Sequence, residues 1–196
     1  MTPEKEIRAV YDADTIRIYQ AYNDAIADSA LKHSTFVSPP FKMDRMTWIK
    51  PSFLWMMYRA GWGYKDDNQK RILAIDISRD GFDWILNNAC LSHFNPDVYE
   101  SKEDWEIQKK GKSVVIQWDP ERDIKLQPLS FRSIQIGLKG IAVAKYTNEW
   151  IKKISDVTPL AHEIHRSIEN GDTEKAKLKL PEERTYPIPE GCLITK

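Results

Sequence analysis

Three cations and a serine accompany one almost wholly apolar segment of this chain. In the stretch 45–62, RMTWIKPSFLWMMYRAGW, Ser52 and Arg59 are separated by seven positions. Two helical turns cover that spacing, so both side chains project from one stripe of a predicted helix. Arg45 and Lys50 approach the same stripe from the residues before the helix. Long cations at the edge of a core form a site for an anion such as phosphate.

The same residues also have a purely structural interpretation. Arg59 and Lys50 can extend their charged ends to solvent or pair with carboxylates, because charged side chains are rarely buried without a partner. The sequence leaves both interpretations open.

Other polar residues lie within or next to apolar segments. Such a group needs a partner, or its burial costs about 1 to 3 kcal/mol. One explanation is mutual pairing, for example of Asp76 with Arg59 or Arg132, and the other is a cleft that binds a ligand. The set comprises Tyr19, Gln20, Arg45, Lys50, Ser52, Tyr58, Arg59, Asp76, Arg132, Ser133 and Gln135. Because the set contains one acid, mutual pairing does not satisfy all of its cations.

Hydrophobic periodicity predicts the elements that position these residues. The alternation in 15–22 predicts a strand, and 24–33 predicts a helix. Pro51 fits the first turn of the next helix, since its missing N–H has no partner there. The segment 71–77 predicts a strand buried on both faces, and Ser78 is expected to cap a helix.

The second half of the chain gives a weaker pattern. Strands are predicted over 114–118 and 131–138 and joined as a long hairpin, with a turn at Trp118-Asp119-Pro120. Residues 93–112 are expected to form a loose surface connection. A helix after Gly140 is expected to run through Ile151 and Ile154, and Thr158 is expected to start another that ends near Gly171.

These elements predict one α+β domain over residues 1–171, with a mixed, mostly antiparallel sheet flanked by helices. Residues 172–196 are charged and contain proline, and we expect them to form a tail that packs on the surface.

Composition limits the partners. The 29 basic and 29 acidic residues cancel, so any anion site must be local. Two distant cysteines favour a reducing compartment, and no secretory signal is recognisable, so we expect a cytoplasmic protein without a membrane partner. His162 and His165 lack further ligands at zinc spacing, so no metal is expected.

Five segments resemble the domain-of-unknown-function family numbered 4291. They are IRAVYD, TIRIYQAY, RMTWIKPSFLWMMYRAGWG, ILAIDISRDGF and FRSIQIGLKG, and the resemblance covers nearly the whole chain. The family name carries no activity that can be transferred.

The segments 15–36 and 36–56 also resemble, in pattern, the ADP-ribosyltransferase superfamily, in particular its DNA-modifying branch. This resemblance implies NAD as substrate, cleavage of the glycosidic bond to nicotinamide, and transfer of ADP-ribose to a nucleic acid or small-molecule acceptor. Gln20 or Arg17 would approach the ribose, and Arg45 and Lys50 the pyrophosphate. The candidate catalytic residues are Gln20, Tyr58 and Gln135, and the candidate binding residues are Arg17, Tyr19, Arg45, Trp48, Lys50, Ser52, Arg59, Arg132 and Ser133.

The sequence departs from that superfamily at the catalytic acid. A glutamate on a late strand usually steadies the positive charge that develops on the ribose. Gln135 is an amide and supplies no charge, so Glu103, Glu106 or Glu149 would have to be brought in by the fold. The alternative function is a non-catalytic module that binds a nucleotide or a nucleic-acid end through the same cations and aromatic rings. A third is an interaction protein whose polar core residues are purely structural.

Overall fold

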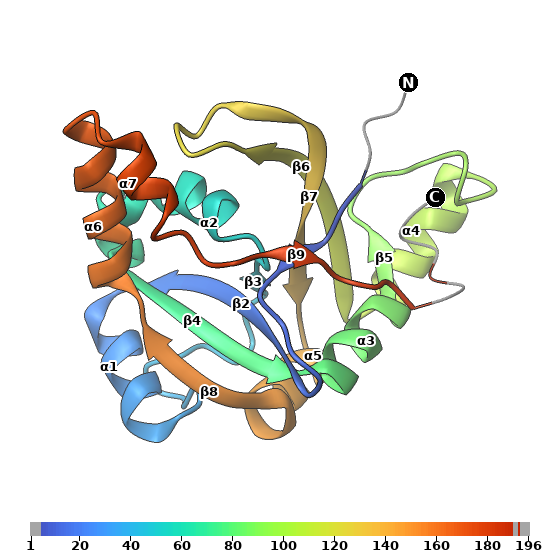
Figure 1. The fold of residues 1–196 in the computed structure, drawn as a ribbon. Helices are drawn as coiled ribbons and strands as arrows, with labels where there is room; N and C mark the ends of the chain where they lie inside the picture. Colours follow the sequence, from blue (N-terminus) through green and yellow to red (C-terminus); the bar gives the residue numbers. More distant parts are fainter. Residues whose placement is uncertain (1–4, 190–191, 193–196) are drawn as a thin grey trace.

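Two β-sheets lie on either side of a C-terminal strand in the computed structural model, which describes residues 5–189 and 192 (Figure 1). The first sheet has the order β2-β4-β8, with β2 at Thr15–Tyr22, β4 at Arg71–Ser78 and β8 at Ile151–Asp156. Its strands are antiparallel. The predicted strands over 15–22 and 71–77 are confirmed.

The second sheet has the order β3-β7-β6-β5, in which only the short pairing of β5 with β6 is parallel among its described strands. The strands are β3 (Thr47–Ile49), β5 (Ala89–Leu91), β6 (Val114–Arg122) and β7 (Pro128–Leu138).

The predicted hairpin of the second sheet is confirmed, but its strands are longer than expected. Trp118-Asp119-Pro120 lies inside β6, so the prediction of a turn there was wrong. The turn occurs at Asp123, whose carboxylate accepts the N–H groups of Lys125 and Gln127. A short acceptor that satisfies these N–H groups is the feature that fixes a turn.

Helix α1 (Asp24–His33) confirms the helix predicted over 24–33, and it begins after Asn23, whose side chain accepts the Ile26 N–H. Helix α2 (Phe53–Ala60) begins after Ser52, whose hydroxyl accepts the Trp55 N–H at 3.1 Å. Pro51 therefore lies before the cap and not in the first turn. Gly61 ends α2 in the left-handed conformation, with φ of 56°.

Helix α3 (Arg79–Asn87) begins after Ser78 as expected. Residues 93–112 were expected to be a loose connection, but they contain α4 (Lys102–Gly111). Ser101 caps this helix, and none of its residues is buried, so it has no continuous apolar stripe to reveal it in the sequence.

The helix expected after Gly140 is shorter than predicted. Helix α5 (Ile141–Lys145) passes into a π-helical turn, Tyr146–Trp150, and β8 then begins at Ile151. Ile151 and Ile154 thus pack from a strand and not from a helix. The next helix, α6 (Thr158–Glu169), is confirmed.

After α6 the chain forms α7 (Thr173–Lys177), makes a turn at 178–180 and then crosses the molecule as an extended segment, residues 181–189, which we call the strap (Figure 1). Its strand β9 (Arg184–Thr185) pairs with β1 (Arg8–Ala9) near the start of the chain. Short 3₁₀ turns occur at Gly61–Gly63 and Asp67–Gln69. The described chain is one α+β domain with seven helices and mostly antiparallel sheets.

Candidate functional site

A polar network covers one face of the β6–β7 hairpin. Asp119 accepts hydrogen bonds from two amide side chains, Gln117 Nε2 at 2.9 Å and Gln135 Nε2 at 2.8 Å. Gln117 and Gln135 are directly opposite in the antiparallel register, so their side chains share a face. The two amides thereby fix the Asp119 carboxylate in position.

Lys50 faces this network from the residue after β3. It is only 6% exposed, and its main chain is held by hydrogen bonds in both directions with Tyr19. Its amine makes no hydrogen bond or ion pair with any described residue. Burial, together with the charge of nearby Arg59, lowers the pKa of Lys50 to about 8, while the charge of Asp119 opposes the change.

Arg59 is exposed in the last turn of α2 and forms no ion pair within residues 5–189. Arg45 is likewise exposed, in the loop before β3. Arg59 therefore extends to solvent, which is one of the two forms of the structural interpretation, whereas Lys50 is neither exposed nor paired with a carboxylate among the described residues. We call Lys50, Arg59, Asp119, Gln117 and Gln135 the lysine cluster.

Next to the lysine cluster on β6 lies a cavity of about 370 Å³ between α2, the hairpin and the strap. Its lining contains two glutamates and two arginines. The lining residues are Arg8, Ser52, Leu54, Glu121, Arg122, Asp123, Leu129, Phe131, Leu180, Pro181 and Glu183. We call it the carboxyl cavity.

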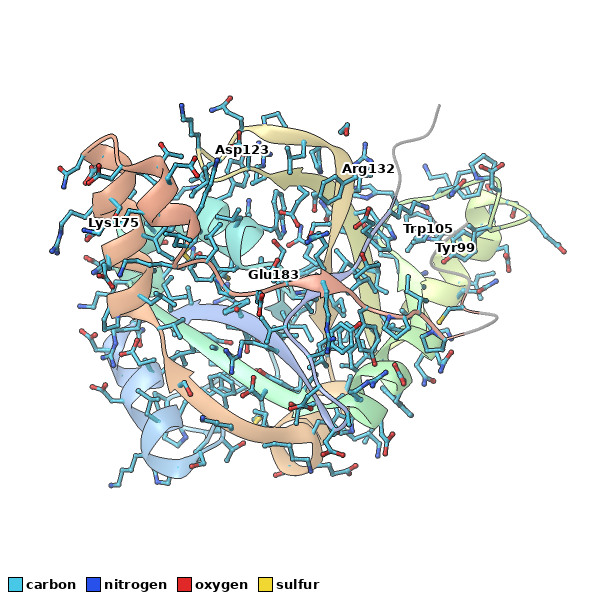
Figure 2. All side chains as sticks on the ribbon, viewed as in Figure 1. Tyr99, Trp105, Asp123, Arg132, Lys175 and Glu183 are labelled. Atoms are coloured by element: carbon cyan, nitrogen blue, oxygen red, sulfur yellow. The ribbon has the colours of Figure 1, made fainter. Side chains whose placement is uncertain are left out.

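Glu183 reaches the carboxyl cavity from the strap, near the middle of the view in Figure 2. The residue is partly exposed, but its carboxyl group is buried, and Oε1 accepts the Phe53 N–H at 2.6 Å. Burial raises the pKa of Glu183 to about 8, and the negative charge of Glu121 adds to the increase. The Glu183 carboxyl is therefore mostly protonated at neutral pH.

Glu121 is 3% exposed and comes from the end of β6, beside a register shift in the hairpin. Its Oε1 accepts the Arg122 N–H at 2.8 Å, and its Oε2 has no hydrogen-bond partner among the described residues. Burial raises the pKa of Glu121, although the Arg122 N–H and the hydroxyls of Ser52 and Ser133 oppose the change. A buried carboxyl oxygen without a partner is available to a ligand or to a proton.

Arg122 closes one side of the carboxyl cavity. Its guanidinium carbon lies 3.7 Å from the ring centroid of Tyr58 and 5.5 Å from that of Trp55. The two rings are stacked, with centroids 5.2 Å apart. Tyr58 is therefore held by a cation–π contact at the surface of α2.

Several predicted site residues have structural partners. The Gln20 amide is 3% exposed and donates to Tyr22, to Thr47 and to the Trp48 carbonyl, while its oxygen accepts the Tyr146 hydroxyl. This network joins β2 to β3 and to the π-helical turn, and it leaves no donor of Gln20 for a ligand.

Arg17 forms a two-point ion pair with Asp76, with distances of 2.7 and 3.0 Å. Asp76 thus pairs with its direct neighbour across β2 and β4, and not with Arg59 or Arg132. Tyr19 is 1% exposed and packs edge-on against Phe53, and burial raises the pKa of its hydroxyl.

The remaining predicted residues belong to the second sheet or border it. Arg132 donates to the Trp118 carbonyl at 3.0 Å, and Ser133 is buried beside Glu121. Trp48 is partly exposed and lies over Gly137, where a Cβ atom would come within 3.2 Å of the indole ring. The structure therefore brings Lys50, Ser52, Tyr58, Arg59, Ser133 and Gln135 to this side of the hairpin and keeps Gln20 and Arg17 in the first sheet.

The glutamates considered from the sequence lie elsewhere. Glu103 and Glu106 are exposed on α4, and Glu149 is exposed and pairs with Lys145. Sequence reasoning missed Glu121 and Glu183. The signal for Glu121 was the alternation of polar residues at 117, 119 and 121, which only becomes visible once β6 is extended to Arg122. Glu183 lies in a charged tail that gives no periodic signal.

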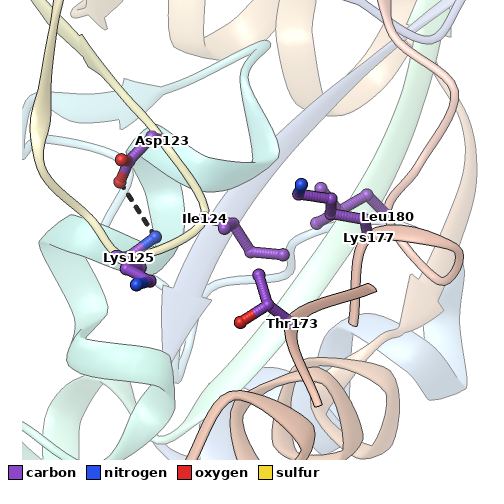
Figure 3. Close-up of a pocket in the computed structure, with 6 residues that line it drawn as sticks. All are labelled: Asp123, Ile124, Lys125, Thr173, Lys177 and Leu180. Atoms are coloured by element: carbon purple, nitrogen blue, oxygen red, sulfur yellow. Dashed lines mark hydrogen bonds between the residues drawn. The ribbon is translucent and has the colours of Figure 1, made fainter. Parts of the chain in front are cut away.

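A second opening, with a volume of about 630 Å³, adjoins the carboxyl cavity and shares Asp123 and Leu180 with it (Figure 3). Asp123, Ile124 and Lys125 of the hairpin turn line it, opposite Thr173, Lys177 and Leu180. The Asp123 carboxylate is occupied by the turn, so this opening offers little fixed chemistry.

The rings of His162 and His165 stack on aromatic side chains. His162 stacks on Tyr64 with ring centroids 4.4 Å apart, and His165 stacks on Trp62 at 5.4 Å. Within the described residues no group of three or more potential ligands gathers in a way that suits a metal ion.

The fold and these groups define a small α+β protein with a buried carboxyl pair beside two cations, Lys50 and Arg59, that form no ion pair with any described residue. The chain belongs to the family described as Domain of unknown function (DUF4291), whose model matches residues 6–186. Comparison with curated proteins finds no match. None of the described helices combines the length and the hydrophobicity that a membrane crossing requires.

Proposed function

We propose that this protein is an enzyme that cleaves the glycosidic bond of a nucleotide, with NAD as the first candidate substrate and a nucleic acid or small molecule as the acceptor of ADP-ribose. The observation that carries the proposal is the pairing of two buried carboxyl groups, Glu121 and Glu183, in one cavity. Cleavage of a glycosidic bond develops positive charge on the sugar and negative charge on the leaving group. A carboxylate and a protonated carboxyl group serve those two needs.

The two glutamates divide these roles by environment. Glu183 has the higher pKa, of about 8, and keeps a proton at neutral pH, so it is suited to act as the acid or to donate a hydrogen bond. Glu121 retains contacts that favour its charged form, from the Arg122 N–H, from Ser52 and Ser133, and from Arg8. It is suited to stabilise the developing positive charge, and it supplies the acid that Gln135 cannot.

The neighbouring cations suit the phosphates of such a substrate. Lys50 and Arg59 lack carboxylate partners among the described residues, and they lie beside the same strand that carries Glu121. Trp48 offers a partly exposed ring for stacking. This arrangement also supports a second candidate, a nucleotide-binding module without catalysis, in which the cations alone matter.

The test is calorimetric titration with NAD, followed by chromatographic assay of the same mixture for free nicotinamide. We expect binding and release by the wild-type protein. Glu121→Gln should still bind NAD, but its rate of nicotinamide release should fall by a factor of about a hundred or more, since it loses one electrostatic contact to the transition state. Glu182→Gln, at the exposed neighbour of Glu183, is the matched control and should match wild type.

The outcomes separate the two candidates. If the wild-type protein and both variants bind NAD but release no nicotinamide, the non-catalytic module is favoured. Its affinity for NAD should also fall as the salt concentration is raised. Absence of NAD binding, or release that is insensitive to Glu121→Gln, contradicts the enzymatic proposal.

A further inference from the structure

Lys50 carries a reactive group that the proposed transferase does not use as a nucleophile. Its side chain is largely buried, with the residue 6% exposed, yet its amine has no hydrogen-bond or ion-pair partner in residues 5–189. A largely buried cation without a partner is costly, and such a cost is retained where the group has a ligand. Its main chain is held on both sides by Tyr19, so the position of its Cα is well defined.

The surroundings of Lys50 suit an uncharged amine that reacts. Three influences set its charge: desolvation by the core and the nearby Arg59 disfavour the ammonium form, while Asp119 favours it. With a pKa of about 8, roughly a tenth of the amine is unprotonated at pH 7, against fewer than one in a thousand for an ordinary lysine. Only the unprotonated amine is a nucleophile.

We propose that Lys50 is a covalent site that forms an imine with a phosphorylated aldehyde or ketone. Nζ attacks the carbonyl carbon, and the carbinolamine then loses the carbonyl oxygen together with the two amine protons as water, which leaves a C=N bond. The fixed Asp119 carboxylate, held by Gln117 and Gln135, stabilises the positive charge of the protonated imine. Arg59, which is exposed and has no ion-pair partner in the described chain, lies beside Lys50 and binds the phosphate.

The site does not depend on cleavage of NAD, because its chemistry needs only the amine and the neighbouring cation. A failure of the transferase proposal therefore leaves it standing, and the experiment that tests it contains no NAD.

The experiment uses pyridoxal 5′-phosphate as the probe, with borohydride to reduce the imine to a stable secondary amine, followed by intact-mass measurement and peptide mapping. We expect one label per chain at low probe concentration, on the peptide that contains Lys50. Lys50→Arg keeps the charge but forms no stable imine, so the label should fall at least tenfold, since an arginine stays protonated. Lys42→Arg, at an exposed lysine in the preceding loop, should label as wild type does.

Two further measurements define the site. The rate of labelling should rise with pH around a midpoint near 8. Arg59→Met should slow labelling by pyridoxal 5′-phosphate severalfold and leave labelling by pyridoxal, which lacks the phosphate, unchanged. Thermal melting of each variant shows that the loss of label does not reflect unfolding. Lys50→Met, which also lacks the amine, should melt cooperatively and should lose the label as Lys50→Arg does. Label that is spread over exposed lysines, or that persists in Lys50→Arg, overturns the proposal.

Discussion

The Tyr146 hydroxyl donates a hydrogen bond of 2.7 Å to Gln20 Oε1 across 126 positions of sequence. The two residues belong to the π-helical turn and to β2, and Gln20 connects both to β3 through Thr47 and the Trp48 carbonyl. One buried amide thus determines how three elements meet beneath the lysine cluster.

Replacement of that amide tests its structural role. Gln20→Leu should lower the free energy of unfolding by roughly 2 to 5 kcal/mol, because Tyr146, Thr47 and the Trp48 carbonyl lose their buried partner. Urea denaturation of the variant beside Gln127→Leu, at an exposed position, provides the measurement and its control. A change below about 1 kcal/mol would show that the network is replaceable.

Lys50→Met should raise stability at neutral pH. The folded-state pKa of about 8 lies below the unfolded value of 10.5, so the unfolded chain holds more protons between these values and wild-type stability increases with pH across that window. Methionine removes the burial cost of the ammonium group, and we expect a gain of about 1 to 3 kcal/mol at pH 7. Denaturant unfolding from pH 7 to 10.5 measures it, with Lys42→Met as the exposed control. A loss of stability in Lys50→Met would mean that the amine is well solvated or paired.

Glu183 should make the fold less stable as pH rises. Its folded-state pKa of about 8 is above the unfolded value of 4.5, so its contribution is fully present below 4.5 and is lost as pH rises to 8. Glu183→Gln keeps a neutral acceptor for the Phe53 N–H and should reduce this decline by roughly 3 to 5 kcal/mol, as a shift of this size implies. Unfolding curves between pH 4.5 and 8 measure the slope, and Glu182→Gln should leave it as in wild type. An unchanged slope in Glu183→Gln would contradict the assignment of the proton to this residue.

Gly81 leaves room for the indole ring of Trp150. A Cβ atom at this position would overlap Trp150 Cγ, so Gly81→Ala should destabilise the fold by about 1 to 3 kcal/mol. At Gly111 a methyl group would have no heavy atom within 4 Å, and Gly111→Ala is the control, expected to be neutral or slightly stabilising. Melting temperatures of both variants measure the difference. Equal melting temperatures would mean that the π-helical turn moves easily.

Sequence reasoning recovered what depends on local periodicity. The strand at 15–22, the helix at 24–33 and the hairpin all follow from patterns within a few residues. It missed β8, because Ile151 and Ile154 at a spacing of three match the inner face of a helix, whereas the strand that forms there pairs with β4 through a register shift. Tertiary pairing with β4 decides that case.

The site residues show the same contrast between features that are visible in the local sequence and features that depend on distant parts of the chain. Lys50, Ser52 and Arg59 were recognisable because each interrupts an apolar run, and the structure gathers them with Gln135 and Ser133 near β6. Glu121 and Glu183 were not, since a glutamate in a turn-rich or charged segment looks solvated until a distant element covers it. Gln20 and Arg17 show the reverse, because their partners Tyr146 and Asp76 come from remote parts of the chain.

The pairing of β1 with β9 sets the order in which the carboxyl cavity is assembled during synthesis. Arg8 is opposite Thr185 in that pairing, so β1 is synthesised long before the strand with which it pairs. The nascent chain can form the sheet that contains Glu121 earlier, but Glu183 arrives with the strap. Until then the carboxyl cavity lacks one of its two acids, and a chain interrupted before this point would hold Glu121 alone.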